Sequence, residues 1–254
     1  MDRELELAAR LGMASRSGIQ ARGVAPTAEA VSRLATLAGP LPEAPTAATD
    51  VVALLDRVGS PATVASTGGR YFGFVIGGSL PAAQAAGWLA GAWDQNGSYP
   101  VMSPVANALE EIATGWVRDL LGLPPEAAAG LVTGATMANF SALAAARQHL
   151  LARQGWDVGA DGLFGAPPLR VVAGDEVHVS VLKALRLLGL GSGRVERVAT
   201  DDQGRMRADL LPALDDRTIV CTQVGNVNTG ASDPCQLLCE RAADRGAWVH
   251  VDGA

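Results

Sequence analysis

The feature that most constrains this fold is a regular alternation of short apolar runs and amphipathic segments that begins after Gly130. We predict strands at residues 169–173, 194–199, 219–224 and 248–251, with a shorter apolar run at 131–133. We predict helices between them at 137–154, 180–188, 208–214 and 234–245. Strand–helix–strand connections of this length predict an α/β domain with a mostly parallel sheet covered on both faces. Such a sheet binds its ligand beyond the carboxyl ends of its strands, so we expect chemistry near residue 252.

The first part of the chain has a different pattern. Residues 1–65 are predicted to be a helical N-terminal segment, with helices at 28–37 and 48–58 around a proline-rich connection. Residues 66–254 would form the large domain, which opens with helices at 81–94 and 104–121. Within the second of these helices, apolar residues recur every three or four positions, which predicts core packing. They are Leu109, Ile112, Trp116 and Leu120.

Composition excludes some classes of function. The 254 residues carry a net charge of -6, which argues against a nucleic-acid partner. No apolar run approaches the ~20 residues that span a bilayer, and the acidic N-terminus lacks the apolar core of a signal peptide. Cys221, Cys235 and Cys239 lack the spacing of a zinc or redox site, so we expect reduced thiols, no metal and a cytoplasmic location. Lys183 is the only lysine and therefore the only candidate for lysine chemistry.

Two polar constellations precede predicted helices. The small residues 133–136 and the following helix N-terminus could bind an anion through free N–H groups, with Thr136 adding a hydroxyl. A small-residue turn that merely caps the helix explains the same pattern. His178 and Ser180 open the helix after the first long strand. Here the ordinary interpretation is a helix-entry histidine with Ser180 as the N-cap.

Two more constellations follow later strands. Residues 225–234 contain turn glycines and an Asp233-Pro234 pair suited to start a helix, but turn chemistry does not explain Asn226, Asn228 and Thr229. Asp252 ends an apolar strand, where a buried carboxylate is costly without a cation. A protonated pyridine nitrogen would be such a cation, and a metal ion and an arginine are the competing partners.

Taken in order, these segments resemble the pyridoxal-phosphate-dependent group II decarboxylases, the aromatic-L-amino-acid and glutamate decarboxylase family. The segments that carry the resemblance are Arg70-Tyr71-Phe72-Gly73-Phe74-Val75, Gly77-Gly78-Ser79-Leu80-Pro81, Trp93-Asp94-Gln95-Asn96, Ser103-Pro104, Thr133–Asn139, His178–Ala184, Gly225–Asp233 and His250–Ala254. The resemblance runs from about Arg22 to the last residue. It implies the aspartate-aminotransferase-like fold, known as fold type I, and an enzyme that decarboxylates an L-amino acid with pyridoxal 5'-phosphate, as a homodimer.

The resemblance also implies roles for single residues. Ala135 and Thr136 match positions that hold the cofactor phosphate, and His178 matches the imidazole that stacks on the pyridine ring. Asp252 matches the carboxylate that pairs with the ring nitrogen. Two further cofactor-binding positions are implied. Ala254 would lie against the ring, and Asn228 would replace a hydroxyl that Val227 cannot supply.

One element of the family pattern is absent. The family's Schiff-base lysine lies in a His-Lys pair beyond the aspartate strand, and Lys183 matches a different lysine in the stacking-histidine motif. We therefore expect the chain to be a truncated N-terminal half of such an enzyme. The alternatives are another fold type I enzyme, such as an aminotransferase or a different lyase, and an inactive fragment that acts through a partner chain.

Overall fold

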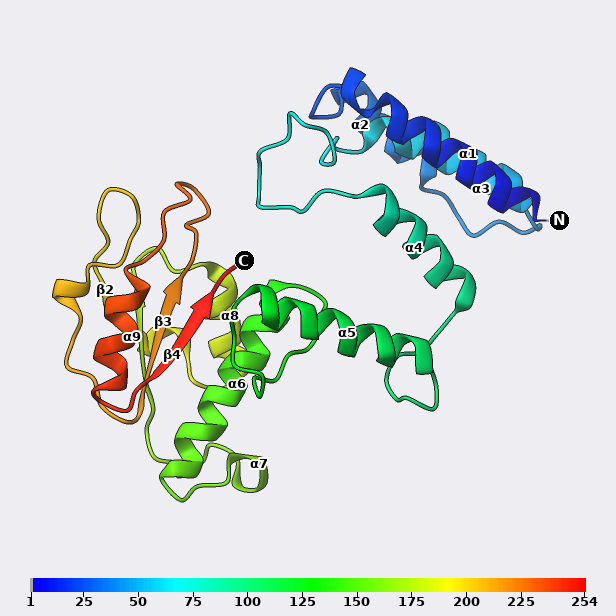
Figure 1. The fold of residues 1–254 in the computed structure, drawn as a ribbon. Helices are drawn as coiled ribbons and strands as arrows, with labels where there is room; N and C mark the ends of the chain where they lie inside the picture. The colour runs from blue at the N-terminus through cyan, green and yellow to red at the C-terminus, as the bar shows by residue number, and fades with distance from the viewer. Residues whose placement is uncertain (1) are drawn as a thin grey trace. The chain divides into compact units, whose positions relative to one another are not determined.

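The computed structural model describes residues 2–254 and divides into two compact units, Met1–Gln95 and Asn96–Ala254 (Figure 1). The boundary expected near residue 65 stays a prediction about the domains of the protein. No helix in the described part of the chain combines the length and apolar character needed to cross a membrane.

The N-terminal unit is helical. Its elements are α1 (Arg3–Gly18), the short turns η1 (Ile19–Ala21), η2 (Leu34–Leu37), η3 (Leu55–Gly59) and η4 (Ser60–Ala62), and the helices α2 (Ala28–Arg33), α3 (Ala48–Leu54) and α4 (Pro81–Trp93). Helix α1 packs against α3. The Thr27 side chain caps α2 by accepting a hydrogen bond from the Ala30 N–H at 3.1 Å. The predicted helices at 28–37 and 48–58 are thus present. The first ends in the tighter 3-10 turn η2, and the second ends in the wider π-helical turn η3.

The second unit contains the predicted parallel sheet. Its helices are α5 (Pro104–Leu120), α6 (Ala135–Arg153), α7 (Val158–Asp161), α8 (Val179–Leu187) and α9 (Cys235–Ala243), with the short turns η5 (Ser192–Arg194) and η6 (Ala208–Leu210). Its strands are β1 (Arg170–Gly174), β2 (Glu196–Val198), β3 (Thr218–Gln223) and β4 (Trp248–Asp252). The order is β2-β1-β3-β4, and every pair is parallel. The register pairs Gln223 of β3 with Asp252 of β4 at the carboxyl edge.

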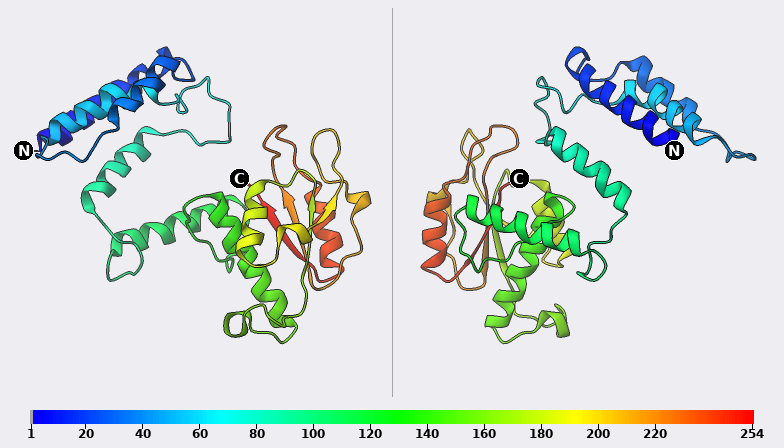
Figure 2. Two further views of the ribbon diagram at one scale, coloured as in Figure 1. Left: turned by 180° about the vertical axis from the view of Figure 1, so that it is seen from behind. Right: turned by 45° about the vertical axis from the view of Figure 1, so that its right-hand side comes forward.

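Alternating side chains of the strands form one core on each face of the sheet. Val171 and Ala173 of β1 pack with Leu143 of α6 and Leu185 of α8, all of them buried. The intervening Val172 packs on the opposite face, where buried residues from β2, α9 and the segment around η6 surround it. Figure 2 shows α6 and α8 on one side of the sheet and α9 on the other. The two-faced α/β architecture is therefore confirmed.

Three local predictions are wrong. Residues 131–133 form no strand. Only Ala208–Leu210 of the segment 208–214 is helical, because Pro212 disfavours helical backbone at the residue before it. The stripe on α5 is not core in this chain, since no other described element packs closely over that face; its exposed fractions run from 47% at Ile112 to 84% at Leu120.

Candidate active site

The candidate site is built on the carboxyl edge of the sheet. Because β1, β3 and β4 are parallel, their last residues meet at one edge, where Asp252 ends β4. His178 follows β1 by a short turn and is the N-cap of α8. Helix α6 supplies Asn139, which is buried with 3% of its surface exposed. Three separate elements thus deliver polar side chains to one place.

A continuous chain of hydrogen bonds joins these side chains. The Asn139 Nδ2 donates to Asp252 Oδ2 at 3.1 Å and to Ser180 Oγ at 3.0 Å. The Ser180 Oγ lies 2.7 Å from His178 Nδ1. The Asn139 Oδ1 lies 2.7 Å from His250 Nε2. The two predicted catalytic residues, His178 and Asp252, are therefore connected through Asn139 and Ser180.

The hydrogen-bond pattern assigns the protons of His178. Its Nδ1 accepts from the backbone N–H of Ser180 at 3.3 Å, which places a lone pair and not a proton on Nδ1. The Ser180 hydroxyl, which accepts from Asn139, then donates its own proton to the same nitrogen. In its neutral form, His178 therefore carries its proton on Nε2, and the residue is exposed. We expected Ser180 to be the N-cap of α8. Instead, His178 is the N-cap, and its side chain accepts a hydrogen bond from the backbone N–H of Ser180.

His250 lies beneath the site with 4% of its surface exposed. Burial lowers its pKa below the usual value, and the nearby charge of Asp252 opposes that shift only in part. The ring is thus neutral near pH 7. Its Nε2 must carry the proton, because the Asn139 Oδ1 that it faces can only accept.

Asp252 is buried, with 8% of its surface exposed. Its Oδ1 accepts from the backbone N–H of Ala254 at 3.2 Å, and its Oδ2 accepts from Asn139. Among residues 2–254, no arginine, lysine or histidine side chain forms an ion pair with this carboxylate. A desolvated carboxylate with only neutral donors is suited to a cationic ligand. Arginine, one of the competing partners, is not in place within the described chain.

The first turn of α6 lies one helical turn from this network. The helix begins at Ala135 after Gly134, whose φ of 149° is a conformation that favours glycine. Thr136 therefore lies in the first turn, as expected. Ala135 and Thr136 precede Asn139 by four and three residues, so all three share one side of the helix. The N–H groups of Ala135 and Thr136, at the start of this turn, are the ones available to an anion, because the Met137 N–H already donates to the Gly134 carbonyl at 3.0 Å.

The loop after β3 organises itself largely by its own hydrogen bonds. The Asn226 Oδ1 accepts from the N–H groups of Asn228 and Thr229, at 2.8 Å and 3.3 Å, and its Nδ2 donates to Glu176 at 2.9 Å. The Thr229 hydroxyl donates to the Gln203 carbonyl at 2.7 Å. These contacts explain Asn226 and Thr229 structurally. Asn228 and Ala254 are exposed, and their contacts with a cofactor stay predictions.

Asp233 closes the base of that loop. Its carboxylate accepts from the Met206 N–H, the Thr222 hydroxyl and the Gln223 N–H at 2.7, 2.9 and 2.8 Å. We expected Asp233 to cap α9, but that helix has Pro234 at its N-cap and no side-chain cap. Asp233 instead holds the loop against the carboxyl end of β3.

Lysine and cysteine chemistry lies outside the network. Lys183 is exposed on α8, and none of the hydrogen bonds of the network involves it. Burial, and to a smaller extent the charge of Asp252, raises the pKa of the Cys221 thiol to about 12. A thiol that stays protonated at pH 7 is a poor nucleophile.

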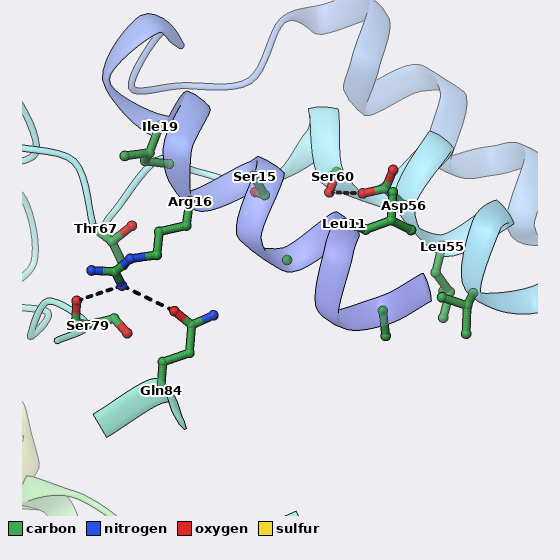
Figure 3. Close-up of a pocket in the computed structure, with 13 residues that line it drawn as sticks. Leu11, Ser15, Arg16, Ile19, Leu55, Asp56, Ser60, Thr67, Ser79 and Gln84 are labelled. Atoms are coloured by element: carbon green, nitrogen blue, oxygen red, sulfur yellow. Dashed lines mark hydrogen bonds between the residues drawn. The ribbon is translucent and has the colours of Figure 1, made fainter. Parts of the chain in front are cut away.

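A separate cavity of about 510 Å³ lies within the N-terminal unit, between α1, α3 and the start of α4 (Figure 3). Several of its polar groups are already paired with one another. The Arg16 Nη1 bonds to the Ser79 carbonyl at 3.4 Å and to Gln84 Oε1 at 3.2 Å, and the Ser60 hydroxyl donates to Asp56 at 2.8 Å. The described residues that line this cavity include no buried, unpaired carboxylate comparable to Asp252.

Sequence reasoning missed two members of the network. Asn139 was recognised only as part of the small-residue turn, although its position one turn after Ala135 places it on the same side of α6. The sequence indicated His250 only as the first residue of the segment that contains Asp252. Its inward orientation is set by the alternation of β4, which also buries Asp252 two residues later.

Comparison with known proteins identifies the family of this chain. A family model described as the pyridoxal-dependent decarboxylase conserved domain matches residues 62–254. The chain therefore belongs to the pyridoxal-dependent decarboxylase family. Among curated relatives, tryptophan decarboxylase 1 of Oryza sativa subsp. japonica is 32% identical over 206 residues, which is 73% of this chain and 39% of that protein. The aromatic-L-amino-acid decarboxylase of Bacillus atrophaeus is 30% identical over 157 residues, which is 59% of this chain and 30% of that protein.

Solved structures establish the fold. Mouse CSAD superposes with a TM-score of 0.86 at 22% identity, covering 100% of this chain and 54% of that one. Oryza sativa TDC, crystallised with PLP and tryptamine, gives 0.83 at 24% identity, covering 99% of this chain and 54% of that one. The predicted fold type I architecture is confirmed. The chain spans about half the length of these solved structures and less of the curated relatives.

Proposed function

We propose that this chain forms the cofactor-binding part of a pyridoxal-phosphate-dependent enzyme that decarboxylates an L-amino acid. The observation that carries the proposal is the Asp252 carboxylate, which is buried at the carboxyl edge of a parallel sheet and faces only neutral donors. A buried carboxylate of this kind is stabilised when a cation enters, and a protonated pyridine nitrogen is such a cation.

Asp252 would hold the proton on the cofactor's ring nitrogen. When bound, the cofactor would supply an electron-accepting ring that takes up the electron pair of the Cα–carboxylate bond as carbon dioxide leaves. A carboxylate keeps that nitrogen protonated, because the charged pair is much stronger in a desolvated site than in water. The Asn139 and Ala254 donors hold the carboxylate in one orientation, in which it would meet the ring nitrogen.

His178 would stack on the ring. The residue is exposed and its imidazole is anchored through Nδ1, so the ring plane is held while Nε2 stays accessible. The Nε2–H can also donate to a substrate carboxylate or to a proton acceptor above the ring.

Ala135 and Thr136 would hold the phosphate. They form the first turn of the 19-residue helix α6, where the N–H groups and the helix dipole favour a dianion. Gly134 lets the backbone approach, and the Thr136 hydroxyl adds a donor. Because Asn139 on the same side of α6 contacts Asp252, phosphate and ring nitrogen would be bound at the two ends of one turn.

We also propose that the protein works as a cytoplasmic homodimer. The exposed apolar stripe of α5, which includes Trp116 with 69% of its surface exposed, supports an apolar contact with another polypeptide. The three cysteines are free thiols, which supports a reducing compartment. Sedimentation of the protein at its natural length would test the dimer; a monomer at micromolar concentration would contradict it.

The test of the activity uses the protein at its natural length, loaded with pyridoxal phosphate and offered a panel of aromatic, acidic and basic L-amino acids. We expect carbon dioxide and the matching amine in equal amounts for at least one of them. Formation of the 2-oxo acid without carbon dioxide would instead establish transamination. No cofactor binding and no product from any member of the panel would refute the proposal and favour an inactive chain.

A further inference from the structure

We propose that Asn139 is a positioning residue that sets both Asp252 and His178. One side-chain amide holds the carboxylate directly and holds the imidazole through the Ser180 hydroxyl. The meaning of this arrangement for the cofactor rests on the function proposed above. The arrangement itself rests on the contacts of this chain alone.

The amide of Asn139 is fully used. An asparagine side chain has two N–H donors and a carbonyl acceptor, and here the two donors go to Asp252 and Ser180 while the acceptor takes the Nε2–H of His250. A carboxylate accepts only, so the amide nitrogen must face Asp252 and the flipped orientation is excluded. His250 reinforces this choice, because its neutral Nε2–H needs an acceptor.

The location of Asn139 argues that its side chain and not its backbone matters. It lies in the second turn of α6, buried against α8 and β4. Asparagine is among the weaker helix formers, and a buried amide is costly unless all of its hydrogen bonds are made. An alanine would suit the helix itself better. The contacts to the site are therefore what the asparagine contributes.

Two consequences follow for the functional groups. Without Asn139, the Asp252 carboxylate keeps only the Ala254 N–H and is free to rotate about its last side-chain bond. The Ser180 hydroxyl loses the donor that fixes its rotor, so the proton it gives to His178 Nδ1 is no longer enforced. Removal of one amide should thus disturb the ring-nitrogen partner and the stacking group together.

The binding test measures the dissociation constant of pyridoxamine 5'-phosphate, which binds without a covalent bond, for the protein at its natural length. We expect Asn139→Ala to weaken binding roughly ten- to hundredfold, the range for loss of a buried hydrogen bond to a charged group. Thr218→Val is the matched control, since Thr218 is equally buried but bonds to Asp215 at the opposite end of β3. It should leave the dissociation constant unchanged.

A double mutant separates positioning from general destabilisation. If Asn139 acts through Asp252, the Asn139→Ala and Asp252→Asn double variant should bind little more weakly than Asp252→Asn alone. Losses that multiply would overturn the proposal. If Asp252→Asn itself leaves binding unchanged, the proposed function fails instead. If only Asn139→Ala leaves binding unchanged, the proposed function stands and this inference is refuted.

A spectroscopic test needs no cofactor. The chain has three histidines, His149, His178 and His250, so nitrogen NMR of histidine-labelled protein can be assigned by single substitutions. We expect the neutral forms of both His178 and His250 to carry their proton on Nε2. Ser180→Ala should mix the tautomers of His178 and leave His250 unchanged, whereas Asn139→Ala should change both. A wild-type His250 that carries its proton on Nδ1 would overturn the proposal, even if the Asn139 variant did not fold.

Discussion

Replacement of Asp252 by asparagine should weaken cofactor binding without lowering the stability of the cofactor-free protein. In the protein without cofactor, the carboxylate is buried and bonds only to the Asn139 amide and the Ala254 N–H. Desolvation of such a charge costs several kcal/mol, even after the protein relaxes. An asparagine removes the charge and keeps an oxygen that can accept one of the two bonds.

The direction of the change in the free energy of unfolding depends on which is larger, the lost hydrogen bond or the avoided desolvation of the carboxylate. The Asp252→Asn variant loses one hydrogen bond, worth about 1.5–3 kcal/mol when the acceptor is charged, and avoids the larger desolvation term. We therefore expect the free energy of unfolding without cofactor to be unchanged or to rise by about 1–3 kcal/mol. With cofactor, one partner of a buried ion pair is missing. The loss of about 3–5 kcal/mol corresponds to roughly two to four powers of ten in the dissociation constant.

Urea denaturation with and without pyridoxamine phosphate measures both quantities. The matched control is Asp215→Asn. The pKa of that carboxyl is lowered, chiefly by the Thr218 hydroxyl and further by the Arg217 N–H and Arg170, so its removal should destabilise the fold without affecting cofactor binding. The reasoning is refuted if Asp252→Asn destabilises the cofactor-free protein as Asp215→Asn does, or if it binds the cofactor as wild type.

Three further changes test other parts of the structure. Folding lowers the pKa of His250, so the unfolded chain binds its proton more readily and stability should fall as pH drops below about 6.5. His250→Gln should flatten that part of the curve in urea titrations at different pH, and an unchanged slope would contradict the assignment. Gly204→Ala should destabilise, because φ is +74° and the new Cβ would lie 2.5 Å from the Asn226 amide nitrogen and 2.6 Å from Glu176 Oε2; equal or greater stability in urea would contradict this. Leu143→Ala should cost about 2–5 kcal/mol in a core that is fully buried, and a loss below about 1 kcal/mol would show that the helix–sheet packing is looser than described.

A strand could be predicted from the sequence where its own residues determine its structure. The run expected at 219–224 is β3 at Thr218–Gln223, because its β-branched residues are buried on both faces of a parallel sheet. Helix α6 begins two residues earlier than predicted. Its N-cap is Gly134, with no side-chain cap to mark the start. The exposed stripe on α5 has a helical period but finds no partner among the described residues, and periodicity alone gives no information about the partner.

The candidate site, too, could be predicted from the sequence only in part. The parallel order of the strands was enough to bring the ends of β1, β3 and β4 to one edge, and so to place His178 and Asp252 together. The link between them was not predictable. Asn139 and Asp252 are 113 positions apart, and their contact depends on the register of β4 and the rotation of α6 about its axis. The sequence pattern does not determine this register or this rotation precisely enough to predict a hydrogen bond. The polar network is therefore the part of the site for which the structure adds most, and it makes Asn139 a more discriminating test than His178 or Asp252.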